Sequence, residues 1–245
     1  MEFIPFWILY QLFRILPLQA AYSISNGLFR IFYLLDSKHR TRAIRHLQHA
    51  GVAKSEIEAD GMARKVFLNF SMLLVEIIKM DQFFTPDKVN FSGSAATEQE
   101  TLRRGVENQN VIIVTAHYGN WELAGSVWAH FSGIPMVSVM REFENPLIGN
   151  YILRNRAGAN HKVISKNGGI KGLLKALHDH KTIAILADQH ASSSDGVETT
   201  FFGQPCRTHF SPALLHLKTG IPIMPEITRR LDNKFNFRCL NLREV

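Results

Sequence analysis

His117 and Glu122 are the residues of this chain whose types and spacing best suit catalysis. They lie in the segment VIIVTAHYGNWELAG, in which a β-branched run predicts a buried strand that ends just before His117. Gly119 permits a sharp turn, and Asn120 predicts the N-terminal cap of the helix that follows. Because the turn lies between them, the imidazole of His117 can fold back toward the carboxylate of Glu122. Polar groups at the carboxyl end of such a strand stand where α/β folds usually bind ligands.

A carboxylate on one ring nitrogen fixes the tautomer of the imidazole and leaves the other nitrogen as a base. The chain has no G-x-S-x-G nucleophile elbow, no H-E-x-x-H zinc motif and no phosphate-binding glycine loop. A base without a protein nucleophile suits direct transfer, in which it deprotonates a substrate hydroxyl that attacks an activated acyl group. Taken alone, H-x-x-x-x-E is a short motif, and a helix-capping Glu beside a surface His is the open alternative.

Strands and helices alternate around this segment. Buried strands are predicted at residues 111–116, 136–140, 182–187 and 222–227, and helices at about residues 121–130, 146–156, 169–180 and 212–219. This alternation predicts a single α/β domain with a mostly parallel mixed sheet flanked by helices. The segment QHASSSDGVETT is expected to be a loop.

A further helix precedes the sheet. Ser55 and Glu58 form an S-x-x-E capping box, which predicts a helix from there to about Met80. Its apolar residues recur at helical spacing and are expected to face the core: Met62, Val66, Phe67, Phe70, Leu73, Leu74, Ile77 and Ile78.

The charge of the chain is concentrated near its beginning. Lys and Arg number 28 against 21 Asp and Glu, a net charge of +7, and residues 1–50 hold six basic and two acidic residues. Residues 3–35 are mostly apolar and aromatic, interrupted by Arg14, Pro17 and Arg30, and the basic run KHRTRAIR follows. Such a segment suits the surface of an anionic bilayer, and its apolar character argues against nucleic acid. The alternative is a helical hairpin packed on the domain. We therefore expect a membrane-associated helical segment at 1–50 and the α/β domain at 51–245.

Several motifs in order resemble the bacterial lipid A biosynthesis acyltransferase family, which is related to the glycerolipid acyltransferases. They are HYGNWE at 117–122, MREFENP at 140–146, the arginine at 156, ADQ at 187–189 and FFGQPCRT at 201–208. The resemblance extends from about residue 3 to residue 230 and includes the apolar start with its basic flank. It implies a glycerolipid-acyltransferase-like α/β fold.

The resemblance also implies an enzyme at the cytoplasmic face of the bacterial inner membrane. Its donor would be acyl carrier protein or a CoA thioester, its acceptor a hydroxyl of a glycolipid such as a lipid A precursor, and no cofactor or metal is implied. His117 would be the general base and Glu122 its partner. The implied substrate-binding residues are Asn120, which also shapes the turn, Arg141 and Arg156 for anionic phosphate groups, and Asp188 in a supporting role.

One departure from the family pattern leaves alternatives open. Family members continue into a basic, Trp-containing segment that has no counterpart after Val245. The chain would then be a shortened or incomplete member. The alternatives to the function given above are an acyltransferase that acts on a different membrane lipid, and a catalytically inactive membrane-bound protein of the same fold that binds lipid or carrier protein. The two cysteines, Cys206 and Cys239, form no disulfide framework and favour a reducing compartment.

Overall fold

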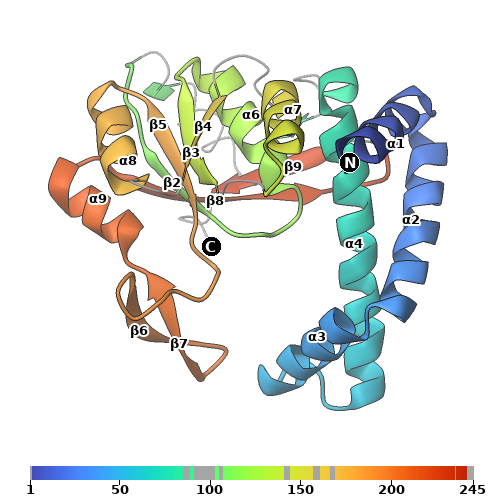
Figure 1. The fold of residues 1–245 in the computed structure, drawn as a ribbon. Coiled ribbons are helices and arrows are strands. Elements are labelled where there is room, and N and C mark those ends of the chain that lie inside the picture. Colours follow the sequence, from blue (N-terminus) through green and yellow to red (C-terminus); the bar gives the residue numbers. More distant parts are fainter. Residues whose placement is uncertain are drawn as a thin grey trace.

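The structure, a computed structural model, describes residues 2–84, 89–90, 103–104, 107–140, 144–156, 161–165, 169–234 and 236–241. Four helices come first and lie along one side of the molecule, at the right of Figure 1. They are α1 (Phe3–Ile15), α2 (Leu18–Leu35), α3 (Ser37–His49) and α4 (Glu56–Phe83). Pro17 separates α1 from α2, because proline cannot donate a helical hydrogen bond.

The predicted start of α4 is confirmed. Ser55 is its N-cap, and its hydroxyl accepts a 3.2 Å hydrogen bond from the backbone N–H of Glu58. The carboxylate of Glu58 accepts from the backbone N–H of Lys54 at 2.8 Å. The first interaction satisfies a backbone donor that the first helical turn leaves without a partner, and the second satisfies the N–H of the residue before the cap.

The expectation that one apolar stripe of α4 faces the core is only partly right. Leu73 and Ile78 are buried, but Val66, Phe70 and Leu74 are 38 to 43% exposed. The reason is that α4 has neighbours on several sides, since α1, α2, α3 and α6 all pack against it along its length. Its buried positions therefore do not follow a single helical stripe, and they include Ser71, Glu76 and Lys79.

The rest of the molecule is built around a seven-stranded sheet. Its strand order is β1-β9-β8-β2-β5-β3-β4. Its pairs are parallel apart from β8 with β9. The strands are β1 (Val89–Asn90), β2 (Ile112–Thr115), β3 (Met136–Met140), β4 (His161–Ser165), β5 (Thr182–Leu186), β8 (Ile223–Arg230) and β9 (Phe237–Asn241). The four predicted strands are thus present, and the fold is a mixed α/β domain with a parallel-dominated sheet.

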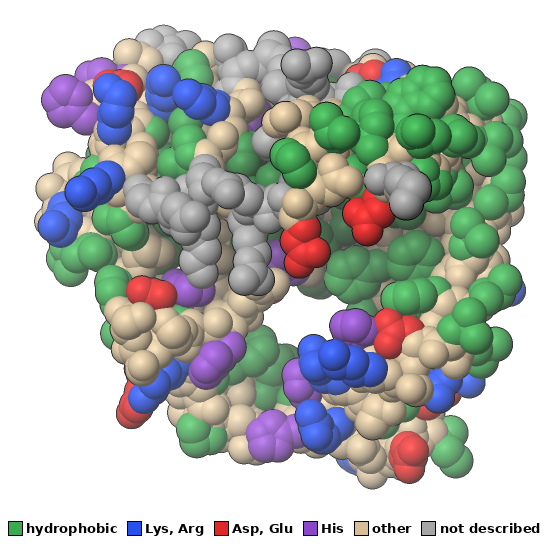
Figure 2. Space-filling view, in the orientation of Figure 1, with side chains coloured by type: hydrophobic (Ala, Val, Ile, Leu, Met, Phe, Trp, Pro, Cys, Tyr) green, Lys and Arg blue, Asp and Glu red, His purple; other side chains and the backbone are tan. Residues whose placement is uncertain are grey.

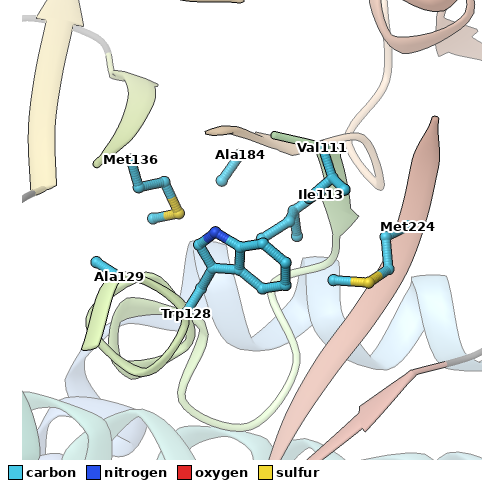
Figure 3. Close-up of a cluster of buried hydrophobic side chains, with 7 residues drawn as sticks. All are labelled: Val111, Ile113, Trp128, Ala129, Met136, Ala184 and Met224. Atoms are coloured by element: carbon cyan, nitrogen blue, oxygen red, sulfur yellow. The ribbon is translucent and has the colours of Figure 1, made fainter. Parts of the chain in front are cut away.

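Helices cover both faces of this sheet: α6 (Trp121–Ser132), α7 (Pro146–Arg156), α8 (Gly169–His178) and α9 (Ser211–Thr219). Alternate residues of each strand point to opposite faces. Ile112 and Ile183 pack under α8 and α9, whereas their neighbours Ile113 and Ala184 pack on the other face. There Trp128 of α6 is the largest side chain of a buried cluster (Figure 3).

Two strands fall within and after the segment expected to be a loop. β6 (Gly196–Phe201) and β7 (Gln204–His209) form an antiparallel hairpin that projects below the sheet in Figure 1. The loop expectation is wrong for residues 196–200, which pair with β7 in a two-stranded ribbon outside the main sheet.

The N-terminal helices are joined to the domain by packed side chains. Tyr10 and Phe13 of α1 lie in a buried cluster with Val75 and Ile78 of α4. Tyr10 also packs edge-on against Tyr151 of α7, with 5.0 Å between the ring centroids. Of the helices described, none is both long and apolar enough to span a bilayer.

Candidate active site

Sheet pairing brings together two polar residues that are 71 positions apart in the sequence. β2 and β5 run parallel and adjacent, with Thr115 opposite Leu186. His117 and Asp188 each follow two residues after these paired positions. Because parallel strands end at the same edge of a sheet, the two side chains leave the sheet at the same place.

Asp188 contacts His117 twice. Its Oδ2 accepts a 2.8 Å hydrogen bond from the backbone N–H of His117, and its Oδ1 lies 2.9 Å from Nδ1 of the imidazole. Each of the two side chains is 32% exposed. With Nδ1 engaged, Nε2 is the ring nitrogen that can meet a substrate, and the side-chain amide of Gln189 lies 3.5 Å from it. A histidine held in this way can act as a general base.

The turn after His117 has the form that the sequence predicts. Gly119 has φ = 60°, and a Cβ atom at this position would collide with the carbonyl oxygen of Thr228 in β8. Asn120 caps α6, and its Oδ1 accepts a 2.9 Å hydrogen bond from the backbone N–H of Leu123. Its backbone N–H donates to Thr228 O at 3.1 Å. The turn is therefore pinned against β8.

Glu122 lies in the first turn of α6, where the helix dipole favours a carboxylate. Its Oε1 accepts a 3.1 Å hydrogen bond from the indole N–H of Trp121. The Trp121 ring in turn packs edge-on against the His117 imidazole, with 5.0 Å between centroids. In this structure the carboxylate on Nδ1 of His117 is that of Asp188, in the place that sequence reasoning gave to Glu122.

The remaining predicted site residues are placed as follows. Asn120 is completely buried, and both polar atoms of its side chain contact protein groups. Arg141 lies outside the described residues, and Arg156 is the last residue of α7, with its side chain also outside them.

Sequence reasoning missed one group of polar residues behind the turn. The carboxylate of Glu76, in α4, contacts Asn120, Tyr22 and Arg230. The signal in the sequence was a charged residue inside the apolar run LLVEII. A charged side chain in such a run is buried only when it has partners. Glu76 could therefore have been identified from this pattern.

The site opens into a hollow. The segments that follow β2 and β5 leave the sheet toward the space between the β6–β7 hairpin and α3 (Figure 1). The space-filling view shows an opening there, with His, Lys and Arg side chains on its rim (Figure 2). A substrate can therefore approach this edge of the sheet from solvent.

Other reactive groups are less suited to chemistry. Cys239 is fully buried, and burial raises the pKa of its thiol, so it is held in its unreactive protonated form. Within the described ranges, no group of three or more His, Cys, Asp or Glu side chains is arranged to hold a metal ion.

Comparisons with known proteins agree with the motifs. The model of a family described as bacterial lipid A biosynthesis acyltransferase matches residues 4–240. The phosphatidylinositol mannoside acyltransferase of Mycolicibacterium smegmatis is 26% identical over 121 residues, which cover 48% of this chain and 39% of that protein. The Mycobacterium tuberculosis (strain H37Rv) protein of the same name is 25% identical over 118 residues, or 46% of this chain and 37% of its own length.

A lipid A biosynthesis acyltransferase of Haemophilus influenzae is also similar. It is 26% identical over 172 residues, which cover 68% of this chain and 52% of the Haemophilus protein. The chain thus spans about half or less of the length of these curated relatives.

Proposed function

Since this chain belongs to the bacterial lipid A biosynthesis acyltransferase family, we propose that it transfers a fatty acyl group from a thioester donor to a hydroxyl of a glycolipid. Acyl carrier protein or CoA carries the acyl group, and a lipid A precursor is one acceptor of this class. The observation that carries the proposal is the contact between His117 and Asp188, just after the carboxyl ends of β2 and β5. It supplies a base and a partner for that base.

The proposed reaction is a direct transfer. Nε2 of His117 takes the proton of the acceptor hydroxyl as the hydroxyl oxygen attacks the thioester carbonyl carbon. The tetrahedral intermediate collapses, the C–S bond breaks, and the thiolate takes the proton back from the imidazolium. The products are an ester and a free thiol. Such general-base catalysis contributes about 10² to 10⁴ in rate.

In this proposal Asp188 orients the imidazole and stabilises the imidazolium that forms during transfer. Its two contacts with His117 fix both the backbone and the ring. Glu122 supports the site from the start of α6, through the indole of Trp121 that packs on the imidazole. Arg141 and Arg156 bind anionic groups of the donor or acceptor, as the family resemblance implies.

We further propose that α1 and α2 lie on the membrane surface at the cytoplasmic face of the inner membrane. Each exposes an apolar stripe at helical spacing: Ile4, Ile8, Leu12 and Ile15 on α1, and Ile24, Leu28, Ile31 and Leu35 on α2. These residues are 43 to 78% exposed, and apolar side chains gather over the two helices in Figure 2. The basic residues of α3 would add attraction to anionic lipid.

Mass spectrometry of total lipids tests this function. Cells that express the chain are compared with cells that lack it, and a lipid with one additional acyl chain is expected. Its mass and fragments identify the acceptor and the chain length together. An unchanged lipid profile, together with binding of lipid or carrier protein, would favour a member of the fold without catalytic activity.

A further inference from the structure

Glu76 is a carboxylate in the interior of the protein, with three partners from other elements. It is 0% exposed and lies in an apolar stretch of α4. Its Oε1 accepts from the Tyr22 hydroxyl at 3.3 Å, and its Oε2 accepts from Nη2 of Arg230 at 2.8 Å. Nε of Arg230 also donates to Oε1. A buried charge is tolerated only when such hydrogen bonds replace its hydration.

The fourth interaction connects this carboxylate to the site. Nδ2 of Asn120 donates to Oε2 of Glu76 at 2.9 Å, while Oδ1 of the same amide caps α6 at Leu123. The amide therefore joins α4 to the first turn of α6. Because its carbonyl must accept from a backbone N–H, its NH₂ group must face an acceptor. The ionised carboxylate of Glu76 fills that requirement.

The turn that follows His117 is held on two sides as a result. Thr228 of β8 accepts from the backbone N–H of Asn120 and lies against Gly119, and Glu76 holds the Asn120 side chain from α4. Asn120 is three residues from His117 and is completely buried, so the turn has little room to adjust. A shift of the Asn120 amide is therefore transmitted to the backbone of His117.

A second contact between α4 and the site lies six residues earlier in the helix, at Phe70. Phe70 of α4 packs edge-on against Trp121, with 6.0 Å between centroids, and Trp121 packs against His117. The contacts of Glu76 and Phe70 both run from α4 to the segment that carries the imidazole. The helix thus sets the position of the imidazole relative to Asp188, which follows β5.

We propose that Glu76 is a positioning residue, which acts through Asn120 to hold the imidazole of His117 in the geometry that acyl transfer requires. This inference rests on the proposed function. It adds to that function a buried carboxylate on which the reaction depends. This carboxylate does not contact substrate, and it lies in a helix outside the strand and loop motifs.

Reversal of one hydrogen bond provides the test. Asn120→Asp places a second carboxylate against Glu76, and Glu76→Gln removes one of the two acceptor oxygens that Asn120, Arg230 and Tyr22 share. Asn120→Asp therefore breaks the contact, and Glu76→Gln weakens the set of hydrogen bonds that supports it. In the double variant Glu76→Gln, Asn120→Asp, the Gln amide donates to the Asp carboxylate, so that the contact is restored and the local charge is conserved.

Kinetics give the first measurement. Each single variant is expected to lower kcat by up to about 100-fold with little change in KM, because misplacement of the base impairs transfer rather than binding. The double variant is expected to recover most of the loss. Lys79→Met is the matched control, since Lys79 is an equally buried charge on the same helix that hydrogen-bonds Arg14 and Gln82 instead of the turn. Its kcat is expected to match that of the wild type.

NMR of the imidazole gives a measurement that needs no activity. The ring resonances of His117 are assigned by their loss in His117→Ala and are then titrated with pH in each variant. Both single variants are expected to shift these resonances and their titration midpoint, and the double variant is expected to restore them. If the wild type transfers no acyl group, the proposed function fails while this measurement still tests the position of His117.

The inference is overturned if a folded Asn120→Asp protein keeps the wild-type kcat and the wild-type His117 resonances. If Asn120→Asp does not fold, the same two measurements on Glu76→Gln, which loses one of the shared acceptor oxygens, take its place, and wild-type values in both would overturn the inference. Lost activity in a single variant with unchanged His117 resonances would equally contradict a role through the imidazole.

Discussion

At the scale of residues, His117 and Asp188 form a unit in which one carboxylate holds both the backbone and the ring of His117. The backbone N–H and Nδ1 of His117 meet different oxygens of Asp188, at 2.8 and 2.9 Å. This double contact restricts rotation of the imidazole as well as its tautomer. Glu122 contacts the indole of the residue that packs on the imidazole. The two carboxylates therefore have different expected roles.

Substitution of each carboxylate by its amide separates these roles. Asp188→Asn is expected to lower kcat by at least about 100-fold, because an amide cannot stabilise the imidazolium as a carboxylate does. Glu122→Gln is expected to lower kcat by less, since the amide oxygen can still accept from the Trp121 indole. Steady-state kinetics of acyl transfer compare the two. A greater loss in Glu122→Gln than in Asp188→Asn would give the orienting role to Glu122.

The sequence could predict that His117 follows a strand and precedes a turn, but not the full set of its neighbours. His117 is recognisable because a strand ends before it and a turn follows, and both are local features. The contact with Asp188 depends on β2 and β5 being adjacent, which no local pattern specifies. The contact of Glu76 with Asn120 depends on how α4 packs against α6, and helical periodicity describes only the helix itself.

At the scale of elements, the buried strands were predictable and the exposed ones were not. β2, β3, β5 and β8 have apolar, β-branched sequences because both faces of the sheet are covered. β4 is an edge strand of five residues, HKVIS, with a much weaker apolar pattern. β6 is largely exposed, and the two large apolar residues of its sequence GVETTF, Val197 and Phe201, are both at least half exposed. This strand therefore lacks the burial that gives other strands a recognisable apolar sequence.

Strand β8 contains a group whose titration should affect stability. Glu226 is 2% exposed, its Oε1 has no hydrogen-bond partner among the described residues, and burial raises its pKa to about 8. In the unfolded chain it titrates near 4.5. Between these values the folded protein holds a proton that the unfolded chain has lost. The contribution of Glu226 to stability is therefore full below about pH 4.5 and is lost as pH rises toward 8.

Glu226→Gln removes this dependence. From pH 5 to 8, the free energy of unfolding of the variant is expected to rise relative to that of the wild type, by up to about 1.4 kcal/mol per pH unit for one proton. Urea unfolding at a series of pH values measures the difference. Glu198→Gln, at a glutamate whose side chain is 81% exposed in β6, is the control and should leave the pH dependence unchanged. Parallel curves for Glu226→Gln and the wild type would contradict the expectation.

At the scale of the whole molecule, one side presents apolar helices, and the edge of the sheet at which β2 and β5 end opens beside them (Figures 1 and 2). The double variant Ile8→Ser, Ile15→Ser removes two residues of the exposed stripe of α1. Its binding to vesicles with anionic lipid is expected to fall by at least about tenfold, because less apolar area enters the interface. Sedimentation with vesicles measures this binding.

The matched control for the membrane surface lies elsewhere on the molecule. Phe201→Ser with Leu217→Ser removes residues that are 66 and 80% exposed in the hairpin and in α9. This variant is expected to bind vesicles as the wild type does. Equal losses in the two double variants would show that the stripe of α1 is not a specific membrane surface.

The central claim, acyl transfer by a His117 base, is tested most directly in membranes that contain the protein. A labelled acyl thioester is supplied, and label in extracted lipid is measured for the wild type, for His117→Ala and for the control His178→Ala, whose side chain is 92% exposed at the end of α8. Transfer is expected in the wild type and the control, with a loss of at least about 100-fold in His117→Ala. Wild-type transfer by a folded His117→Ala protein would contradict the account.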